Sequence, residues 1–315
     1  MIKELHGLTF AGLEQNTHIL GRIDGKGKKQ LLIAMAGMHG NEPAGIEAVN
    51  RVLRVLQQSN KHFEGTFVAL AGNIEALKHN KRFLTTDLNR IWNEENIRLA
   101  QNGIHPESQP EHVALKNLLA HITDLLQEGF DEVALIDLHT TSAEQGVFII
   151  CPDDETHKKM IRRLHVPVIL NLADDLRGTA IEYFWNRGHT AFAFEGGNHT
   201  EKESANKMES AIWLCLEYMG CIKRTEFDNV EYHDQRLIHS TEGLPHFCKL
   251  KYHHYIKPGD AFKMKKGFKN FDSVKKGQLL ATDKNGDIFC PHDGFVLMPL
   301  YQEQGSDGFF IVASH

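Results

Sequence analysis

The first residues able to do chemistry are His39 and Glu42, which directly follow the apolar run 31–36. That run is short and apolar throughout, as is typical of a buried strand in a parallel sheet. Pro43 then begins a helical pattern, so the pair lies where open α/β sheets form ligand crevices. An imidazole and a carboxylate suit zinc when a third ligand joins them, although His39 by itself is commoner as a solvated loop histidine.

A third ligand is offered by His139, at the end of a second apolar run, 133–138. Both runs predict buried strands, and both histidines then lie at the same edge of the sheet. With Glu42, they form the ligand set of catalytic zinc sites that keep a fourth position open for water. Asp137 points to the same side of its strand as His139, and either orients the site from behind or caps a neighbouring loop.

Two arginines flank a polar turn in the segment 82–90. A hydrolase that attacks a carbonyl needs a cation or a donor beside the developing oxyanion, and Arg82 could serve that need. An amino-acid substrate needs a guanidinium fork for its carboxylate, which Arg90 could provide together with Asn89. Either arginine taken alone is more often a surface residue whose stem covers apolar neighbours.

Glu195 ends a further apolar run, 191–194, and two glycines follow it. A carboxyl at the end of a buried strand has a raised pKa if it is desolvated, which suits a general base acting on water. The alternative is an ordinary ion pair with a nearby lysine, and that alternative is the commoner one for a glutamate considered in isolation.

Four motifs occur along the chain in the order HGNE, RxxxxDLNR, DLHTTS and an apolar strand ending in EGG. Together they resemble the succinylglutamate desuccinylase and aspartoacylase family, which has the zinc carboxypeptidase-like fold, over about residues 30 to 200. Four motifs in order are far more specific than any one of them. The resemblance implies one zinc ion per chain, bound by His39, Glu42 and His139.

The same resemblance implies roles for four other residues. Glu195 would activate the attacking water, and Arg82 would polarise the scissile carbonyl. Asn89 and Arg90 would bind the carboxylate of the substrate. These roles agree with those suggested by the chemistry of the residues themselves.

The chain departs from the family pattern before Glu195. Aspartoacylases place an arginine and a tyrosine there to help bind the acyl carboxylate, and this chain has Tyr183 and Arg187 at shifted spacing. The residue types at positions 140–142 are intermediate between those typical of succinylglutamate desuccinylases and those typical of aspartoacylases. Tyr301 would reach the site from the C-terminal part, as a tyrosine does in aspartoacylases, although a buried or turn tyrosine is commoner. These departures leave the acyl group open.

Composition restricts the class of protein. The 315 residues carry a net charge of -6 without a basic run, which argues against nucleic acid as a partner. No segment approaches the ~20 apolar residues that span a bilayer, and the N-terminus lacks the apolar core of a signal peptide. The five cysteines show no CxxC spacing, which favours reduced thiols in the cytoplasm. The expected partner is a small N-acyl amino acid, and a homo-oligomer stays open.

Strand-like and helix-like patterns alternate to about residue 222 and predict a doubly wound α/β domain with a mixed sheet, residues 1–225. The turn 24–27 predicts a hairpin between the first two strands. Beyond this domain, short strands with Asn-Gly and Asp-Gly turns predict a smaller all-β, barrel-like domain, residues 226–315. The smaller domain is similar to biotinyl and lipoyl modules but lacks their carrier-lysine motif, and the family resemblance implies that it shields the active-site entrance.

The predicted function is zinc-dependent hydrolysis of the amide bond of an N-acyl amino acid, of desuccinylase or aspartoacylase type. A zinc carboxypeptidase acting on peptide C-termini would share the ligand set and differ in pocket size. A non-catalytic binding protein of the same fold would have lost Glu195 or a ligand, and all four are present. A carrier domain acting in acyl transfer would need a modified lysine.

Overall fold

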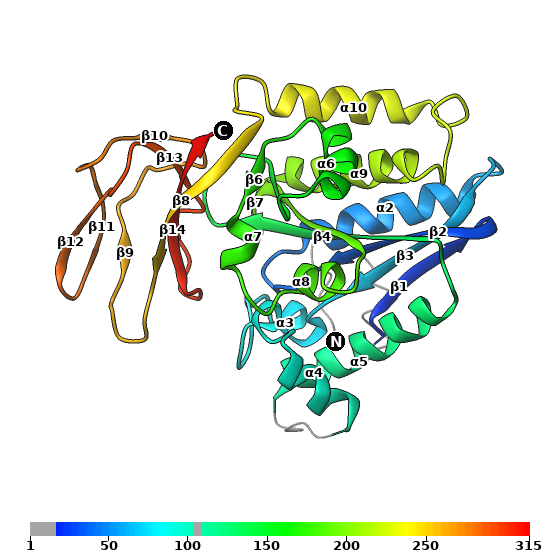
Figure 1. Ribbon diagram of the computed structural model, residues 1–315, viewed down its shortest axis with the longest axis horizontal. Coiled ribbons are helices and arrows are strands. Elements are labelled where there is room, and N and C mark those ends of the chain that lie inside the picture. The colour runs from blue at the N-terminus through cyan, green and yellow to red at the C-terminus, as the bar shows by residue number, and fades with distance from the viewer. Residues whose placement is uncertain (1–16, 104–108) are drawn as a thin grey trace.

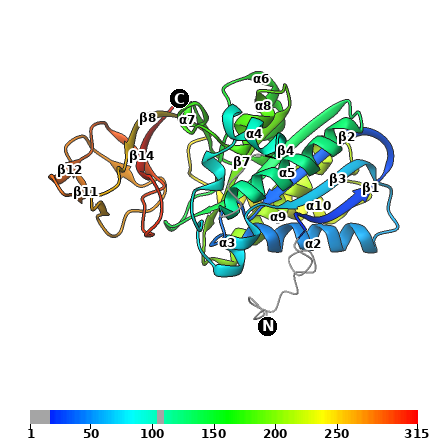
Figure 2. The same ribbon diagram turned by 90° about the horizontal axis from the view of Figure 1, so that it is seen from below.

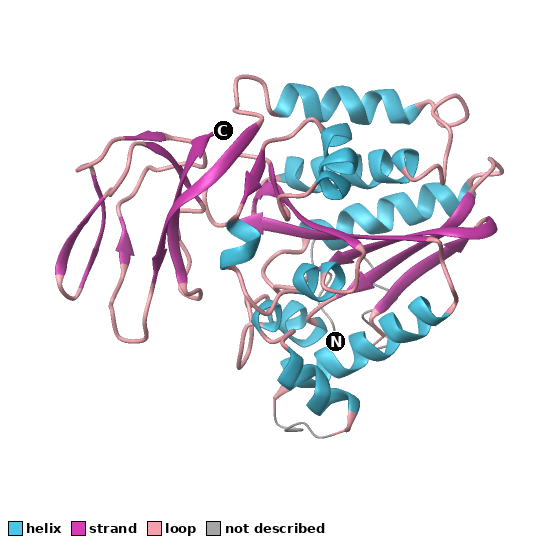
Figure 3. Ribbon diagram, viewed as in Figure 1, coloured by secondary structure: helices cyan, strands magenta, loops and turns pink. Residues whose placement is uncertain are grey.

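The computed structural model describes residues 17–103 and 109–315. Within these ranges the strands form one mixed sheet of eleven strands and a second sheet of three (Figures 1 and 3). The large sheet runs in the order β1 (Ile19–Asp24), β3 (Glu64–Ala71), β2 (Lys26–Ala36), β4 (Glu132–Thr141), β7 (Thr190–Asn198), β5 (Phe148–Ile150), β6 (Val168–Leu170), β8 (Phe247–Tyr255), β14 (Asp307–Ser314), β13 (Gly294–Leu297) and β10 (Ser273–Val274). The predicted α/β class with a mixed sheet is confirmed.

The predicted hairpin between the first two strands is wrong, because β3 lies between β1 and β2. Strand β1 pairs antiparallel with β3, whereas β2 pairs parallel with β3 on one edge and with β4 on the other. Residues 31–36 of β2 are fully buried, so their backbone groups need a paired strand along both edges. Strand β1 is only half-buried and forms the edge of the sheet. The turn at Gly25 is fastened to β3, since Gly25 N donates to Gly65 O at 2.8 Å.

Helices cover both faces of the central strands (Figures 1 and 2). One face carries α2 (Ala44–Gln58), α9 (Lys202–Tyr218) and α10 (Asn229–Ser240), and the other carries α4 (Glu94–Gln101), α5 (Pro110–Gln127) and α8 (Ala180–Trp185). Alternate residues of β2 therefore enter two different apolar cores, Leu32, Ala34 and Ala36 on the first face and Leu31, Ile33 and Met35 on the second. None of the described helices is long and apolar enough to cross a bilayer.

Local residue types mark the ends of several helices. Helix α5 starts at Pro110 and stops before Gly129, and α3 (Ile74–His79) is capped by Asn73, whose side chain accepts from Ala76 N at 3.1 Å. The remaining described helices are short: α6 (Glu155–Ile161), α7 (Leu172–Asp175) and the 3-10 turns η1 (Leu88–Arg90) and η2 (Arg162–Leu164). All five cysteines are free and buried.

The C-terminal strands extend the large sheet, since β8 pairs parallel with β6 and is followed by the antiparallel strands β14, β13 and β10. The three-stranded sheet contains β12 (Gly286–Phe289), β11 (Leu279–Asp283) and β9 (Lys263–Met264). A small separate core around Leu280, Val296 and Phe309 joins the two sheets. Helix α10 also lies beyond residue 225, yet it packs against α9. The division between residues 225 and 226 stays a prediction.

Candidate active site

His39 and Glu42 occupy the tight turn between β2 and α2, at the sheet edge that the sequence predicts. Glu42 N donates to His39 O at 3.2 Å, which closes the turn. Gly40 allows the turn to lie against α3, because a Cβ at this position would be 2.0 Å from the backbone carbon of Ala76. Strand β4 runs parallel beside β2 and so carries His139 to the same edge.

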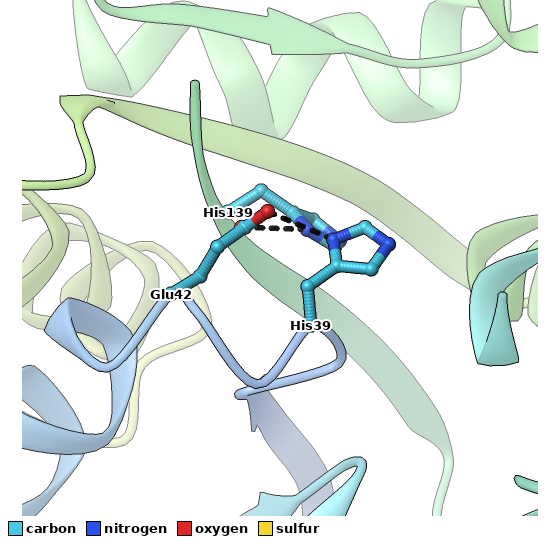
Figure 4. Close-up of side chains that lie close together, drawn as sticks. All are labelled: His39, Glu42 and His139. Atoms are coloured by element: carbon cyan, nitrogen blue, oxygen red, sulfur yellow. Dashed lines mark hydrogen bonds and ion pairs between the residues drawn. The ribbon is translucent and has the colours of Figure 1, made fainter. Parts of the chain in front are cut away.

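The three predicted ligands converge on the carboxylate of Glu42 (Figure 4). Nδ1 of His39 lies 2.9 Å from Oε1 of Glu42, and Nδ1 of His139 lies 3.3 Å from Oε2. Thr140 N also donates to Oε2 at 2.8 Å, which fixes the orientation of the carboxylate. All three side chains are buried, and their ligand atoms lie within 4.8 Å of one another, so the group could bind a metal ion.

Each histidine is held from behind by a second carboxylate. Nε2 of His39 lies 3.1 Å from Oδ1 of Asp87, and Nε2 of His139 lies 2.9 Å from Oδ2 of Asp137. A proton on each Nε2 leaves the lone pair of each Nδ1 directed toward Glu42. Of the two interpretations of Asp137, this contact favours the one in which it orients His139.

Burial and mutual attraction set the charges of this cluster. Burial alone would raise the pKa of Glu42, but His39 and His139 lower it well below its ordinary value. Burial would also lower the pKa of His139, whereas Asp137 and Glu42 raise it well above its ordinary value. An ionised, buried carboxylate between two imidazole nitrogens is a donor set that fits zinc, whose binding would displace the second proton of His139.

Arg82 lies beside this cluster and lines the same cavity. One terminal nitrogen donates to Oε1 of Glu42 at 3.4 Å and the other to Oδ2 of Asp87 at 3.1 Å. Its Nε is buried and has no hydrogen-bond partner among the described residues. The guanidinium therefore brings a positive charge to the metal-binding candidates, as a role at a developing oxyanion requires.

Glu195 lies on β7, whose pairing with β4 places it directly opposite His139. It lines the cavity, is 7% exposed, and its Oε2 has no hydrogen-bond partner among the described residues. Burial raises the pKa of this carboxyl to about 8, and the strongest neighbouring charges come from His139, Glu42 and Arg82. A buried carboxyl whose pKa lies near neutral pH can take up and release a proton there.

Asn89 and Arg90 line the cavity from η1, and both have partners within the chain. Nδ2 of Asn89 lies 3.3 Å from Nε2 of His139, and its Oδ1 accepts from Ala180 N at 3.0 Å. Arg90 donates to Oδ2 of Asp307 at 2.7 Å. Asn89 thus lies against a ligand candidate and is held by the first residue of α8, while the guanidinium of Arg90 is paired with a carboxylate from β14.

The structure does not bring the other three candidates to the cavity lining. Tyr183 is buried, and the guanidinium of Arg187 stacks on its ring, 3.6 Å from the centroid. The hydroxyl of Tyr301 donates to Lys265 O and accepts from Phe268 N, both at 2.9 Å. The substrate-binding roles of these three side chains stay predictions.

Comparison with known proteins settles the family. A family model described as the succinylglutamate desuccinylase/aspartoacylase catalytic domain matches residues 28–219, more than half of the chain. A succinylglutamate desuccinylase of Ectopseudomonas mendocina (strain ymp) is 40% identical over 269 residues, which cover 80% of this chain and 73% of the relative. The chain belongs to this family. It is accordingly an enzyme, an amidohydrolase that removes the acyl group from N-acyl amino acids.

Solved structures of desuccinylases and aspartoacylases share the fold of this family member. The succinylglutamate desuccinylase of Vibrio parahaemolyticus matches 91% of this chain and 82% of its own with a TM-score of 0.65 and 16% identity. A succinylglutamate desuccinylase/aspartoacylase of Rhodobacter sphaeroides matches 93% and 87% with a TM-score of 0.65 and 15% identity. At such identities the likeness concerns the fold.

Three residues for which the sequence predicts no role also join the site of this enzyme: Asp87, His199 and Gln302. Asp87 lies inside the RxxxxDLNR motif, so the motif itself carried a signal. His199 lies shortly after the EGG motif, and its Nδ1 lies 2.6 Å from Oγ1 of Thr140. Its Nε2 lies 3.1 Å from Oε1 of Gln302, which enters from the C-terminal part. No local pattern marks Gln302, because only the tertiary contact brings it to the cavity.

Proposed function

We propose that this enzyme is a zinc-dependent hydrolase that cleaves the amide bond of an N-acyl amino acid in the cytoplasm. The observation that carries the proposal is the buried group of His39, Glu42 and His139 in one cavity with Glu195. Bound at these ligands, zinc would supply Lewis acidity and lower the pKa of water. The free, buried cysteines suit a reducing compartment.

Glu195 would act as the general base and then as the general acid. Its carboxyl lines the cavity and can accept a proton from the attacking water. The buried setting, which raises its pKa to about 8, favours holding that proton until the leaving amine receives it. This cycle needs one carboxyl that changes its protonation state twice in each turnover.

The polar residues around Glu195 would orient and stabilise the substrate. Arg82 lines the cavity, and its positive charge would stabilise the negative charge that develops on the carbonyl oxygen. Arg90, supported by Asn89, would bind the α-carboxylate and so hold the carbonyl in place. Because Arg90 donates to Asp307, the substrate carboxylate would share the guanidinium with Asp307 or displace it.

The proposal is tested by metal analysis and by assays on the purified full chain. We expect about one zinc per chain, and release of a free amino acid that stops on chelation and returns when zinc is added back. A panel of N-acyl amino acids is run beside a dipeptide with a free C-terminus. Hydrolysis of the dipeptide alone would assign a carboxypeptidase reaction instead, and activity without bound metal would overturn the zinc-dependent mechanism.

A further inference from the structure

The cavity is lined by two chemically different sets of residues. The polar set contains the metal-ligand candidates, the neighbouring charged groups and neutral residues, among them Thr140, Thr141, Ser142, Thr179 and Gln302. The second set is apolar: Ala193, Leu300 and five larger or half-buried side chains, called the apolar patch, which are Ile150, Leu176, Ile181, Met298 and Phe310. These side chains belong to one apolar cluster of the protein or pack directly against it. A substrate arm that reaches this side of the cavity therefore meets apolar side chains.

The arginines of the cavity already face carboxylates of the chain. Arg82 donates to Glu42 at 3.4 Å, and Arg90 donates to Asp307 at 2.7 Å. Asp307 is also 2.9 Å from Nε2 of His253, so both of its oxygens are engaged. No other lysine or arginine lines the cavity within the described ranges of the chain. One substrate carboxylate can therefore bind at Arg90. The apolar patch contains no cation to which a second carboxylate could bind.

Helix α8 shows how the apolar patch arises. Tyr183 and Ile181 lie on this same short helix, and it is Ile181, 3% exposed, that lines the cavity. Arg187 lies just beyond the helix and stacks on Tyr183, so its guanidinium is directed to that ring. The side chains expected from the family resemblance to bind a second carboxylate are thus replaced at the cavity by an aliphatic one.

We propose that the substrate of this enzyme carries a single carboxylate and an aliphatic or aromatic arm. The inference rests on the proposed function and names the substrate class of that site. An ionised carboxylate against the apolar patch would lose its hydration without gaining a partner, whereas an apolar group gains by leaving water. Derivatives of aspartate, glutamate and succinate, which carry additional carboxylates, are therefore disfavoured.

The test measures kcat/KM of the zinc-loaded full chain on substrates that vary one arm at a time. N-acetyl-leucine carries an apolar side chain and N-hexanoylglycine an apolar acyl group, while N-acetylaspartate and N-succinylglutamate carry additional carboxylates. We expect at least one of the first two to exceed both of the others by about 100-fold or more. Equal or better turnover of N-acetylaspartate or N-succinylglutamate would overturn the inference and leave the proposed function intact. Lack of turnover on the whole panel would overturn the proposed function, and the inference with it.

Leu176 offers a variant that tests the patch itself, because it is half-buried at the cavity. Leu176→Arg adds a guanidinium beside the patch and is expected to shift the ratio of kcat/KM values toward N-acetylaspartate by about tenfold. Leu176→Met, which adds no charge, is the matched control and should keep the order of preference of the unaltered enzyme. An unchanged ratio in a folded, zinc-binding Leu176→Arg protein would contradict the proposal. Competitive inhibition provides a readout without turnover, and tighter binding of free aspartate than of free leucine to the unaltered enzyme would also contradict it.

Discussion

The two parts of the chain that enclose the cavity contribute different kinds of side chain. The ends of β2 and β4 supply His39, Glu42 and His139, which hold one another through hydrogen bonds, and the end of β7 supplies Glu195. The C-terminal part, between Met298 and Phe310, supplies apolar side chains, Gln302 and the carboxylate of Asp307. We infer that the sheet edge positions the reactive groups, which are the metal-ligand candidates and Glu195. The C-terminal part mainly determines the shape of the space that the substrate occupies.

A short polar contact joins the two parts. Oε1 of Gln302 accepts from Nδ2 of Asn41 at 2.8 Å, and Asn41 lies between His39 and Glu42 in the turn after β2. The C-terminal part is thus attached directly to the loop that carries two ligand candidates. If the two parts have these different roles, substitutions at the strand ends should abolish hydrolysis. Substitutions at the contact between Gln302 and Asn41 should mainly weaken substrate binding.

The largest effect is expected from His139→Ala. The substitution removes one of three ligand candidates and leaves the carboxylates of Glu42 and Asp137 without their shared partner. We expect loss of bound zinc and a fall in kcat/KM of more than about 1,000-fold. Elemental analysis and the deacylase assay check the two outcomes. His246→Ala, at an exposed position outside the cavity, is the control, and a zinc-loaded His139→Ala enzyme would refute the ligand assignment.

Glu195→Gln separates chemistry from metal binding at the same sheet edge. The amide has the shape of the carboxyl but cannot accept the proton of the attacking water. We expect the zinc content to stay unchanged and kcat to fall by about 100- to 10,000-fold. Full activity of this variant on any substrate that the unaltered enzyme hydrolyses would mean that another group is the base.

The next effect concerns helix α10, which lies beyond residue 225 but packs with the N-terminal part. His233 is buried beside Ser210 and Asn229, and burial lowers its pKa from 6.5 to about 4. Between these values the unfolded chain binds a proton that the folded chain does not. The free energy of unfolding therefore rises with pH through this window, and the stabilisation is complete above 6.5. Lowering the pH from about 7 to about 4.5 should cost about 2–3 kcal/mol through this group.

Urea unfolding at the two pH values measures this contribution. His233→Gln cannot take up the proton, so its free energy of unfolding should fall by about 2–3 kcal/mol less than that of the unaltered protein. His239→Gln, at an exposed position of the same helix, should keep the full pH dependence. Identical pH dependences of the unaltered protein and His233→Gln would contradict a lowered pKa of His233 in the folded chain.

The smallest effect is expected from Gln302→Ala, at the contact between the two parts. The change removes the hydrogen bonds to Asn41 and His199, each a modest contribution at a partly exposed site. We expect KM to rise by about 3- to 10-fold, with kcat and zinc content nearly unchanged. Glu303→Ala, an exposed neighbour that does not line the cavity, is the control. A large fall in kcat would show that the C-terminal part takes a direct role in the chemistry.

Those site residues that come at the end of an apolar strand could be predicted from the sequence. His39, His139 and Glu195 each come after such a run, and parallel strands bring their carboxyl ends to one edge. The partners of the substrate-binding candidates could not be predicted in this way. Asn89 accepts from Ala180 across 91 positions of the chain, and Arg90 donates to Asp307 across 217, so no local pattern connects these pairs.

The order of the strands in the sheet could likewise not be predicted from the local sequence. The residues around Gly25 correctly predict a turn, but a turn does not specify which strand lies beside β1. Burial decides the neighbour of β1. The buried strand β2 is paired along both edges, whereas the half-buried strand β1 can have one unpaired edge exposed to solvent.

The sequence by itself determined the elements, the edge at which the charged residues collect and, through its motifs, the family. These properties are local, since they depend on the period of apolar residues and on the residue types at the end of each strand. Only the tertiary structure decided that Asp307 occupies the guanidinium of Arg90 and that Ile181, rather than Tyr183, lines the cavity. Both outcomes depend on how the C-terminal strands and α8 pack against the sheet edge. Such packing is set by the combined burial of residues far apart in the chain.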